Sequence, residues 1–228
     1  MEMPAAASFQ LYEHLLQFQF FQGLSRSELL QIAGNTKFGF QKTAKGKTVV
    51  REYDNCHQLL FLISGRLSYT TQSDTHSYAL TEHLAAPWLL QPEALFGAAT
   101  QFTATVTTET DCHFITLSKD EVMRLLDDFL IIRLNLLNLL STQVQRRSRR
   151  SWRRAPADVQ QLIVRFLLDR CVYPAGPKEV AILMRQLAQE LNATRLEVSQ
   201  ALNSMQDAGL LTLRRGRIVI PLMEHLVM

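Results

Sequence analysis

Side chains able to recognise nucleic-acid bases are concentrated in ten residues near the C-terminal end of the chain. They are Thr194, Arg195, Glu197, Ser199, Gln200 and Asn203. Arginine can donate two hydrogen bonds to a guanine, and glutamine or asparagine can pair with an adenine. Shortly afterwards three arginines surround one glycine, a pattern suited to phosphate contacts. They are Arg214, Arg215 and Arg217. The sequence predicts that these nine side chains contact double-stranded DNA.

The elements that would position these side chains are two short helices and a hairpin. Leu187, Ala188 and Leu191 form the apolar face of a first helix, and Asn192 tolerates the left-handed conformation that a tight turn needs. Thr194 stands three residues before Glu197, the spacing of a helix-capping box. The second helix would bury Val198, Ala201, Leu202 and Met205.

This pattern predicts a helix-turn-helix, and the following LLTLRRGRIVIP predicts a hairpin, so together they indicate a winged helix. The competing interpretation is a two-helix corner of an ordinary bundle. It does not explain the polar outer side of the second helix or the arginines of the hairpin.

A long helix carrying two apolar stripes precedes this region. One stripe holds Phe129, Ile132, Leu136 and Leu139, and the other holds Leu130, Leu137, Leu140 and Val144. Two stripes require cover on two sides. We therefore expect a homodimer formed through residues 129–144, the alternative being a helix buried inside one monomer. The basic segment Arg146–Arg154 follows, either a solvated linker or a contact for phosphates or an acidic partner.

The front half combines a helical start with short β-rich runs. Residues 8–35 show helical spacing, and six β-rich runs without helices between them follow Phe38. The predicted fold class is α+β: an N-terminal antiparallel β-roll, a long dimerisation helix and a C-terminal winged helix-turn-helix. The predicted domains are a sensor domain at 8–126, the helix and basic hinge at 127–154, and a DNA-binding domain at 155–228.

Composition and charge exclude several classes of protein. The 47% hydrophobic and 20% charged residues are typical of a soluble globular protein rather than a disordered one. Residues 1–140 carry a net charge of −4, residues 141–155 carry +6, and residues 156–228 carry +1. Three widely separated cysteines without a CxxC pair argue against a zinc ribbon or an iron–sulfur cluster. No signal peptide or membrane span is indicated, so we expect a cytoplasmic protein.

Nearly the whole chain resembles the Crp/Fnr transcription regulators, relatives of the cyclic-AMP receptor protein. In the front half the resemblance rests on LLFLISGRLSYT at 59–70 and AKGKTVVREYD at 44–54. In the back half it rests on QLAQELNATRLEVSQALNSMQDAGLL and on RGRIVI. The resemblance implies a β-roll resembling a cyclic-nucleotide-binding domain (a double-stranded β-helix), DNA and RNA polymerase as partners, and a base-reading role for Arg195, flanked by Ser199 and Gln200.

The sequence departs from this family where a cyclic nucleotide would bind. The family's phosphate cassette resembles FGE followed by an arginine, whereas here Phe96 and Gly97 are followed by Ala98, and no arginine lies between Arg66 and Arg124. Loss of one charge-assisted bond costs about 1.5–3 kcal/mol. Tyr53 also replaces a turn glycine. The sequence therefore argues against cyclic AMP as the ligand.

The effector is left open by the sequence. We expect the pocket to be lined by Phe96, Gly97, Ala98, Thr100, Gln101, Thr103 and Thr105. A haem would need an axial ligand from among His57, His76, His83 and His113, and nothing further in the sequence supports one. Redox sensing through Cys56 or Cys112 and a roll without a ligand are further alternatives.

Three other functions compete with the leading hypothesis. The first is a regulator of the same fold that does respond to a cyclic nucleotide. A co-regulator would use the same fold to bind protein rather than DNA. A cupin-like metal oxygenase would need a closely spaced histidine pair, and the six histidines provide none. The sequence therefore favours a regulator over an enzyme, without giving the operator or the direction of regulation.

Overall fold

The computed structural model describes residues 11–150, 152 and 154–226. Contacts divide the chain into two units. The first comprises the described residues of Met1–Leu67, Ala85–Thr103 and Thr107–Ser151, and the second those of Ser68–Leu84, Ala104–Val106 and Trp152–Met228. The mixed helices and antiparallel sheets confirm the predicted α+β class. Residues 68–84 group with the C-terminal part of the chain, so contacts divide the chain differently from the predicted boundaries at 126 and 154.

The first unit is built on a four-stranded antiparallel sheet of order β1-β8-β3-β6. Its strands are β1 (Gly39–Thr43), β8 (Cys112–Ser118), β3 (Gln58–Ser64) and β6 (Trp88–Leu90). Nearby, the backbone N–H of Thr108 at the end of β7 (Thr105–Thr108) donates to the Lys47 carbonyl beside β2 (Thr48–Val50), at 2.9 Å. The six β-rich runs of the sequence did not include β1 or β6.

The core of this unit lies on both faces of β3. Leu59 to Leu62 are all buried, and an aromatic cluster covers the strand at Phe61. The Phe61 ring lies 5.0 Å from Phe18, 5.5 Å from Phe21 and 5.8 Å from Phe20, centroid to centroid. These rings come from the N-terminal segment, which is helical at 11–15, in η1 (Gln19–Phe21) and in α2 (Arg26–Asn35). The N-terminal helices therefore form part of the roll's core.

The backbone conformation and close neighbours of position 65 in the β-roll require a glycine there. Gly65, between β3 and β4, has a φ of +103°, and a Cβ there would lie 2.5 Å from Cys112 Sγ and 2.7 Å from the Asp111 carbonyl. Only glycine fits a turn with that backbone and that close neighbour. The glycine within LISGRL is thus a packing requirement of this fold.

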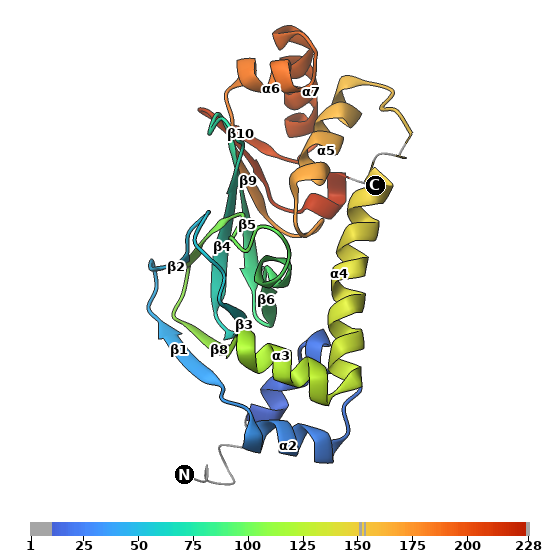
Figure 1. Ribbon diagram of the computed structural model, residues 1–228. Coiled ribbons are helices and arrows are strands. Elements are labelled where there is room, and N and C mark those ends of the chain that lie inside the picture. The colour runs from blue at the N-terminus through green and yellow to red at the C-terminus, as the bar shows by residue number, and fades with distance from the viewer. Residues whose placement is uncertain (1–10, 151, 153, 227–228) are drawn as a thin grey trace. The chain divides into compact units, whose positions relative to one another are not determined.

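The long helix begins slightly later than the sequence indicated. Ser118 caps α3 (Lys119–Asp128) by accepting from the Glu121 N–H, and α4 (Leu130–Arg150) follows after Phe129. Figure 1 shows the two helices meeting at a sharp bend. Asp127 and Asp128 are therefore the last two residues of α3.

The second unit combines three helices with a five-strand antiparallel run of order β10-β11-β9-β5-β4. The strands are β4 (Arg66–Gln72), β5 (Ala79–Ala85), β9 (Lys178–Ala181), β10 (Thr212–Arg214) and β11 (Arg217–Ile220). The helices are α5 (Val159–Arg170), α6 (Met184–Glu190) and α7 (Arg195–Asp207), with short 3₁₀ turns at η2 (Pro92–Leu95) in the first unit and η3 (Met223–Leu226) in the second. This order of elements confirms the predicted winged helix-turn-helix.

The helices of the second unit enclose one hydrophobic core. Ile163 and Leu167 of α5 pack with Val198 and Leu202 of α7, and Ile218 of the hairpin completes the cluster. Each of these five side chains is at least 95% buried. Core and hairpin together fix the position of α7. Among the described residues, no helix is long and apolar enough to cross a membrane.

Candidate nucleic-acid interface

The turn between α6 and α7 has the conformation that its sequence predicts. Asn192 adopts a φ of +51°, in the left-handed region that asparagine tolerates. The N–H of Ala193 donates to the Ala188 carbonyl at 3.0 Å, and Leu187 and Ala188 are buried beneath the turn. The small Ala188 side chain allows the two helices to approach closely. The helix-turn-helix is therefore formed by the residues predicted for it.

A capping box fixes the first turn of α7. The Glu197 N–H donates to Thr194 Oγ1 at 3.2 Å, and Glu197 Oε2 accepts from the Thr194 N–H at 2.8 Å and from its hydroxyl at 2.7 Å. These hydrogen bonds, the side-chain one foremost, lower the pKa of Glu197 below its ordinary value. Thr194 and Glu197 were both predicted to contact DNA. In the free protein their side chains are engaged in starting the helix.

The remaining predicted base-reading side chains lie together on the outer side of α7. Arg195, Gln200 and Asn203 are exposed, and Ser199 is half-buried. Positions 195, 199 and 203 are four residues apart, so they share one face of the helix. Leu196 lies between them with 67% of its surface exposed. An apolar side chain in that place can contact the methyl group of a thymine, and the sequence-based list of contacts did not include it.

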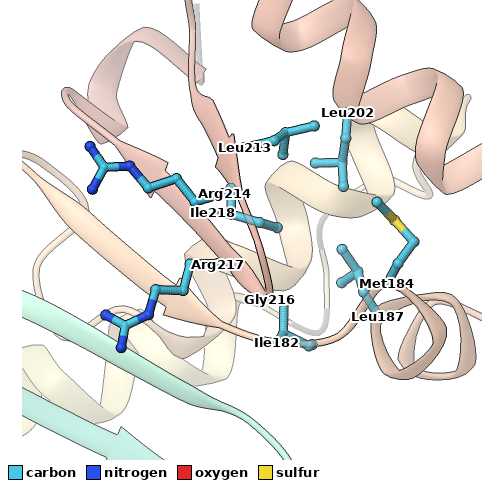
Figure 2. A pocket seen from close by; sticks show the side chains of 9 residues that line it. All are labelled: Ile182, Met184, Leu187, Leu202, Leu213, Arg214, Gly216, Arg217 and Ile218. Carbon is cyan, nitrogen blue, oxygen red and sulfur yellow. The ribbon is translucent and has the colours of Figure 1, made fainter.

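The hairpin that follows α7 separates apolar and basic side chains by strand alternation. Leu213 pairs with Ile218, and Arg214 with Arg217. Figure 2 shows Leu213 and Ile218 directed toward Leu202, Met184 and Leu187 around a small hollow. Arg214 and Arg217 also line the hollow, and their guanidinium ends point away from these apolar side chains. The apolar side anchors the wing to the helices, and the opposite side presents the arginines.

One side chain of α7 ties the wing to the recognition helix. Gln206 Oε1 accepts a hydrogen bond of 2.7 Å from the Leu213 backbone N–H. A hydrogen bond to this backbone group fixes the start of β10 relative to the last turn of α7. The two candidate DNA-contacting surfaces are therefore held in one arrangement by a contact within the unit.

Arg217 differs from the other wing arginines because it already has an acidic partner. Its guanidinium forms an ion pair with Glu179 of β9, the strand next to β11. The sequence interpretation missed this pair, since nothing local to Glu179 indicates that β9 lies beside the wing. Arg214 and Arg215 are both exposed. We therefore expect these two to be the stronger phosphate contacts.

The two interpretations of the basic segment 146–154 both stay open. Trp152 is 87% exposed, and Arg146, Arg147 and Arg149 are exposed on α4. Ser151 and Arg153 lie outside the described residues. Exposure of this kind suits a solvated linker and a phosphate contact equally well.

Six of the seven residues proposed for the effector pocket lie in the loop between η2 and β7, and Thr105 begins β7. Phe96, Thr100 and Thr105 are half-buried, whereas Gly97, Ala98, Gln101 and Thr103 are exposed. Backbone hydrogen bonds fix the loop to residues 53–56: the Cys56 N–H donates to the Thr100 carbonyl at 2.8 Å, and Phe102 exchanges bonds with Tyr53 and Asp54. The structure thus brings six of the seven residues into one loop and places Thr105 at the start of β7, in the second unit.

A buried glutamine that the sequence interpretation missed occupies the inner side of this loop. Gln91 is 4% exposed, and its backbone is left-handed, with a φ of +32°. Its Oε1 accepts from the Thr103 N–H at 2.7 Å and from the Thr103 hydroxyl at 3.0 Å. Two donors that could have faced a ligand are therefore satisfied by the protein itself. The only sequence signal for this turn is Pro92, which sets the start of η2.

A hollow is lined in part by residues 54–58 and by Phe102 of the loop. It is lined by Gln41, Val49, Val50, Asp54, Asn55, His57, Gln58, Leu60 and Phe102. None of the seven proposed effector residues lines it. A cation next to the loop is Lys119, whose Nζ lies 5.2 Å from the centre of the Phe96 ring. This lysine was not part of the predicted pocket.

Two of the four candidate haem ligands, His76 and His113, form hydrogen bonds within the protein. Ser64 Oγ hydrogen-bonds His113 Nδ1 at 2.8 Å, and Gln72 Oε1 hydrogen-bonds His76 Nδ1 at 2.5 Å. Within the described part of the chain, no three His, Cys, Asp or Glu side chains group as a metal site would require. Cys56 and Cys112 are buried, and burial raises the pKa of the Cys56 thiol, which makes that thiol less reactive.

Comparison with known families matches both parts of the chain. The family model of the cyclic nucleotide-binding domain matches residues 40–129, and that of the Crp-like helix-turn-helix domain matches residues 161–227. Together they match well over half of the sequence, in the predicted order. No curated protein sequence matches the chain.

Solved structures support the same fold. The catabolite activator protein of Thermus thermophilus is 18% identical over 92% of this chain and 97% of its own, with a TM-score of 0.50. The sensor domain of the transcriptional regulator DNR from Pseudomonas aeruginosa is 21% identical over 62% of this chain and 93% of its own, with a TM-score of 0.53. A cyclic nucleotide-binding domain from Methylobacillus flagellatus is 17% identical over 61% and 81%, with a TM-score of 0.51.

These likenesses, at low identity, concern the fold, and the family is given by the two matched domains. A cyclic nucleotide-binding domain followed by a Crp-like helix-turn-helix is the organisation of a DNA-binding transcription regulator. The chain belongs to the Crp/Fnr family of transcription regulators.

Proposed function

We propose that this regulator acts in the cytoplasm as a homodimer that reads a two-fold symmetric operator and responds to an effector other than cyclic AMP. The observation that carries the DNA-reading part is the outer face of α7, where Arg195, Gln200 and Asn203 are exposed beside a wing bearing Arg214 and Arg215. Each subunit would place α7 in a major groove, with half-sites about 34 Å apart. RNA polymerase is a further proposed partner, implied by family resemblance alone.

The proposed division of labour follows from the side-chain chemistry. Arg195, Gln200 and Asn203 would contact base edges, with Ser199 beside them. Arg214 and Arg215 would contact phosphates, which position the protein without reading sequence. Thr194 and Glu197 would act mainly by fixing the first turn of α7, where backbone N–H groups can approach a phosphate. With roughly 6–10 phosphate contacts per dimer, affinity should fall by about 10³–10⁵ between 50 and 200 mM salt.

The proposed dimer surface is one face of α4. Ile132 and Leu136 on the first apolar stripe are buried within the unit. The opposite face leaves four large apolar side chains exposed, at Leu130 (65%), Leu134 (47%), Leu137 (54%) and Val144 (66%). Their spacing of four, three and seven residues is that of a helix pairing with another helix. A second copy of the same face is the simplest cover for such a stripe.

A charged substitution on this face tests the dimer. Leu137→Asp should give monomers in sedimentation velocity, because a carboxylate would be buried in the helix pair. Operator affinity should fall by at least about 100-fold, since each half-site would then be bound alone. Asn138→Asp adds the same charge at a neighbouring exposed position and should leave a dimer. A dimeric Leu137→Asp protein would contradict the proposed surface.

The proposal of a different effector rests on the loop after η2. No arginine lies between Arg66 and Arg124, and Gln91 uses both donors of Thr103. A cyclic phosphate would have to displace the Gln91 amide from Thr103 without the arginine that would bind it in return. Such an exchange leaves a buried polar group unpaired, at a cost of about 1–3 kcal/mol.

Selection of DNA fragments by the purified full-length protein, with and without cyclic AMP, tests both parts. We expect a two-fold symmetric motif with half-sites one helical turn apart and the same enrichment in both conditions. Enrichment only with cyclic AMP would contradict the effector proposal and leave DNA reading intact. Absence of any motif in both conditions would contradict DNA reading by this form of the protein, and would favour the co-regulator that binds protein.

A further inference from the structure

A strand hairpin from the effector half forms part of the DNA-binding unit. Strands β4 and β5 lie inside the segment that matches the cyclic nucleotide-binding domain, yet by contacts residues 68–84 belong to the second unit. β5 pairs antiparallel with β9 over four residues, from Ala79 opposite Ala181 to Glu82 opposite Lys178. β9 in turn pairs with β11 of the wing. The hairpin therefore makes β9 an interior strand of the sheet.

The last pair of this ladder is a completely buried ion pair. Glu82 and Lys178 have side-chain exposures of 1% and 0%, and Lys178 Nζ lies 3.3 Å from Glu82 Oε1. Lys178 also donates to the Ala175 carbonyl at 2.6 Å. The carboxylate accepts from the Val172 N–H at 2.7 Å and from the Tyr173 N–H at 3.1 Å. Both charges are thus paired and hydrogen-bonded, as burial requires.

Two more residues, one in β5 and one just before it, contact the winged helix. Leu80 lies in the hydrophobic core of the second unit, 4% exposed. The Tyr78 ring packs against Phe166 of α5, and its hydroxyl accepts a 2.8 Å hydrogen bond from Arg170. Arg170 also binds Glu190, at the end of α6, at 2.9 Å. Leu80 and Glu82 alternate along β5, and Tyr78 immediately precedes this strand, so these contacts all come from one short segment, residues 78–82.

We propose that the β4–β5 hairpin is a latch, held by Glu82 and Lys178, that keeps the wing and the helix-turn-helix ordered for DNA binding. The latch is supplied by the segment that matches the effector domain. A change in that domain which withdraws β5 would leave Lys178 buried without a counter-charge and turn β9 into an edge strand. Withdrawal would also deprive Arg170, the residue that joins α5 to α6, of its Tyr78 contact. A change in the effector domain would in this way alter the order of the DNA-contacting surface.

The geometry predicts a specific pattern of variants. Glu82→Gln leaves a buried ammonium without its counter-ion, and Lys178→Met leaves a buried carboxylate without one. Removing one member of a buried ion pair is strongly destabilising, whereas replacing both members by neutral groups is often tolerated. The double variant Glu82→Gln/Lys178→Met has no buried charge and keeps one acceptor oxygen, in place of two, for the Val172 and Tyr173 N–H groups. Asp74→Ala, at the exposed tip of the same hairpin, is the matched control.

The experiment combines amide hydrogen exchange with operator binding, on the full chain. Each single variant should increase exchange in β5 and β9 by at least about tenfold and weaken operator binding by a similar factor. The double variant should recover both quantities to within about threefold, and Asp74→Ala should match the wild type. Unchanged exchange in the single variants would overturn the latch. Faster exchange with unchanged operator affinity would overturn its link to DNA binding.

The proposed effect of the latch on DNA binding rests on the proposed DNA-reading function. The experiment distinguishes failure of the latch from failure of DNA reading. If the wild-type protein bound no operator, the DNA-reading proposal would fail. Exchange of the β5 and β9 amides in the same samples would still show whether the ion pair holds the hairpin.

Discussion

The outer face of α7 and the loop from residue 96 to 105 both carry polar side chains, but they use them differently. On α7 the capping box engages only Thr194 and Glu197, and Arg195, Gln200 and Asn203 remain exposed. In the loop, the donors of Thr103 are bound by buried Gln91. Polar groups left exposed on a rigid helix are available to a partner, whereas those satisfied internally mainly stabilise the loop.

Among the variants that test this difference between α7 and the loop, we expect the largest change in operator affinity from Arg195→Ala. Arg195→Ala should weaken operator binding by about 10- to 100-fold and relax the preference at one base pair, because a bidentate contact contributes about 1–3 kcal/mol. Binding to a panel of single-base operator variants measures both changes. Arg185→Ala removes an exposed arginine of α6 and should leave base preference unchanged. Uniform weakening across the panel in Arg195→Ala would show that Arg195 contacts phosphate instead.

The wing arginines should affect salt dependence rather than sequence preference. Arg215→Ala should reduce the slope of log affinity against log salt by about 1, the amount expected for one lost phosphate contact. Glu179→Gln should increase the slope by about 1, because it releases Arg217 from its ion pair. Fluorescence anisotropy from 50 to 200 mM salt measures both. Equal slopes in the wild type and both variants would contradict a phosphate-contacting wing.

The loop should respond to substitution in stability and not in DNA binding. Thr103→Val keeps the shape of the side chain and removes one of the two hydrogen bonds to buried Gln91, at a cost of about 0.5–1.5 kcal/mol. Urea unfolding measures the loss, and operator affinity should match the wild type. A fall in operator affinity with unchanged stability would show that the loop takes part in DNA binding.

The smallest effect concerns the pH dependence of the α7 capping box. Because the folded-state pKa of Glu197 lies below its ordinary value of 4.5, the ionised carboxylate stabilises the folded protein. This stabilisation is complete above pH 4.5 and is lost as the pH falls through the lower folded-state value. Thermal unfolding should therefore give Glu197→Gln a lower Tm than the wild type at pH 7, with the difference shrinking toward acid. A difference that stayed constant down to pH 3 would contradict the assignment.

The winged helix could be predicted from sequence because its determinants are local. The Thr194–Glu197 box, the left-handed Asn192 and the apolar spacing of α7 all act within a few residues. The predicted separation of α4 into two stripes also holds at Ile132 and Leu136, which are buried, and at Leu130 and Val144, which are exposed.

The features that sequence reasoning missed depend on residues far apart in the chain. Gln91 meets Thr103 through a turn whose shape is set by buried neighbours, and Glu179 meets Arg217 across two strands. The pair of Glu82 and Lys178 joins residues 96 positions apart through a strand register that no local pattern encodes. The seven loop residues were expected to line a pocket, and their role as an effector site stays a prediction.

Family membership excludes one of the competing hypotheses, the metal oxygenase. Crp-like transcription regulators are not enzymes, so the chain is not a cupin-like oxygenase. Binding of a partner protein to the roll is a separate question. In the DNA-selection experiment, the absence of any enriched motif would favour such a partner.

The most direct test of the account is the spacing of the two half-sites. Once an operator is selected, its affinity should be compared with that of the same DNA with five base pairs inserted between the half-sites, without cyclic AMP. Half a helical turn places the second half-site on the opposite side of the duplex. We predict a loss of at least about 100-fold, because only one α7 could then reach its groove. Equal affinity for the two DNAs would contradict a dimer that reads both half-sites at once.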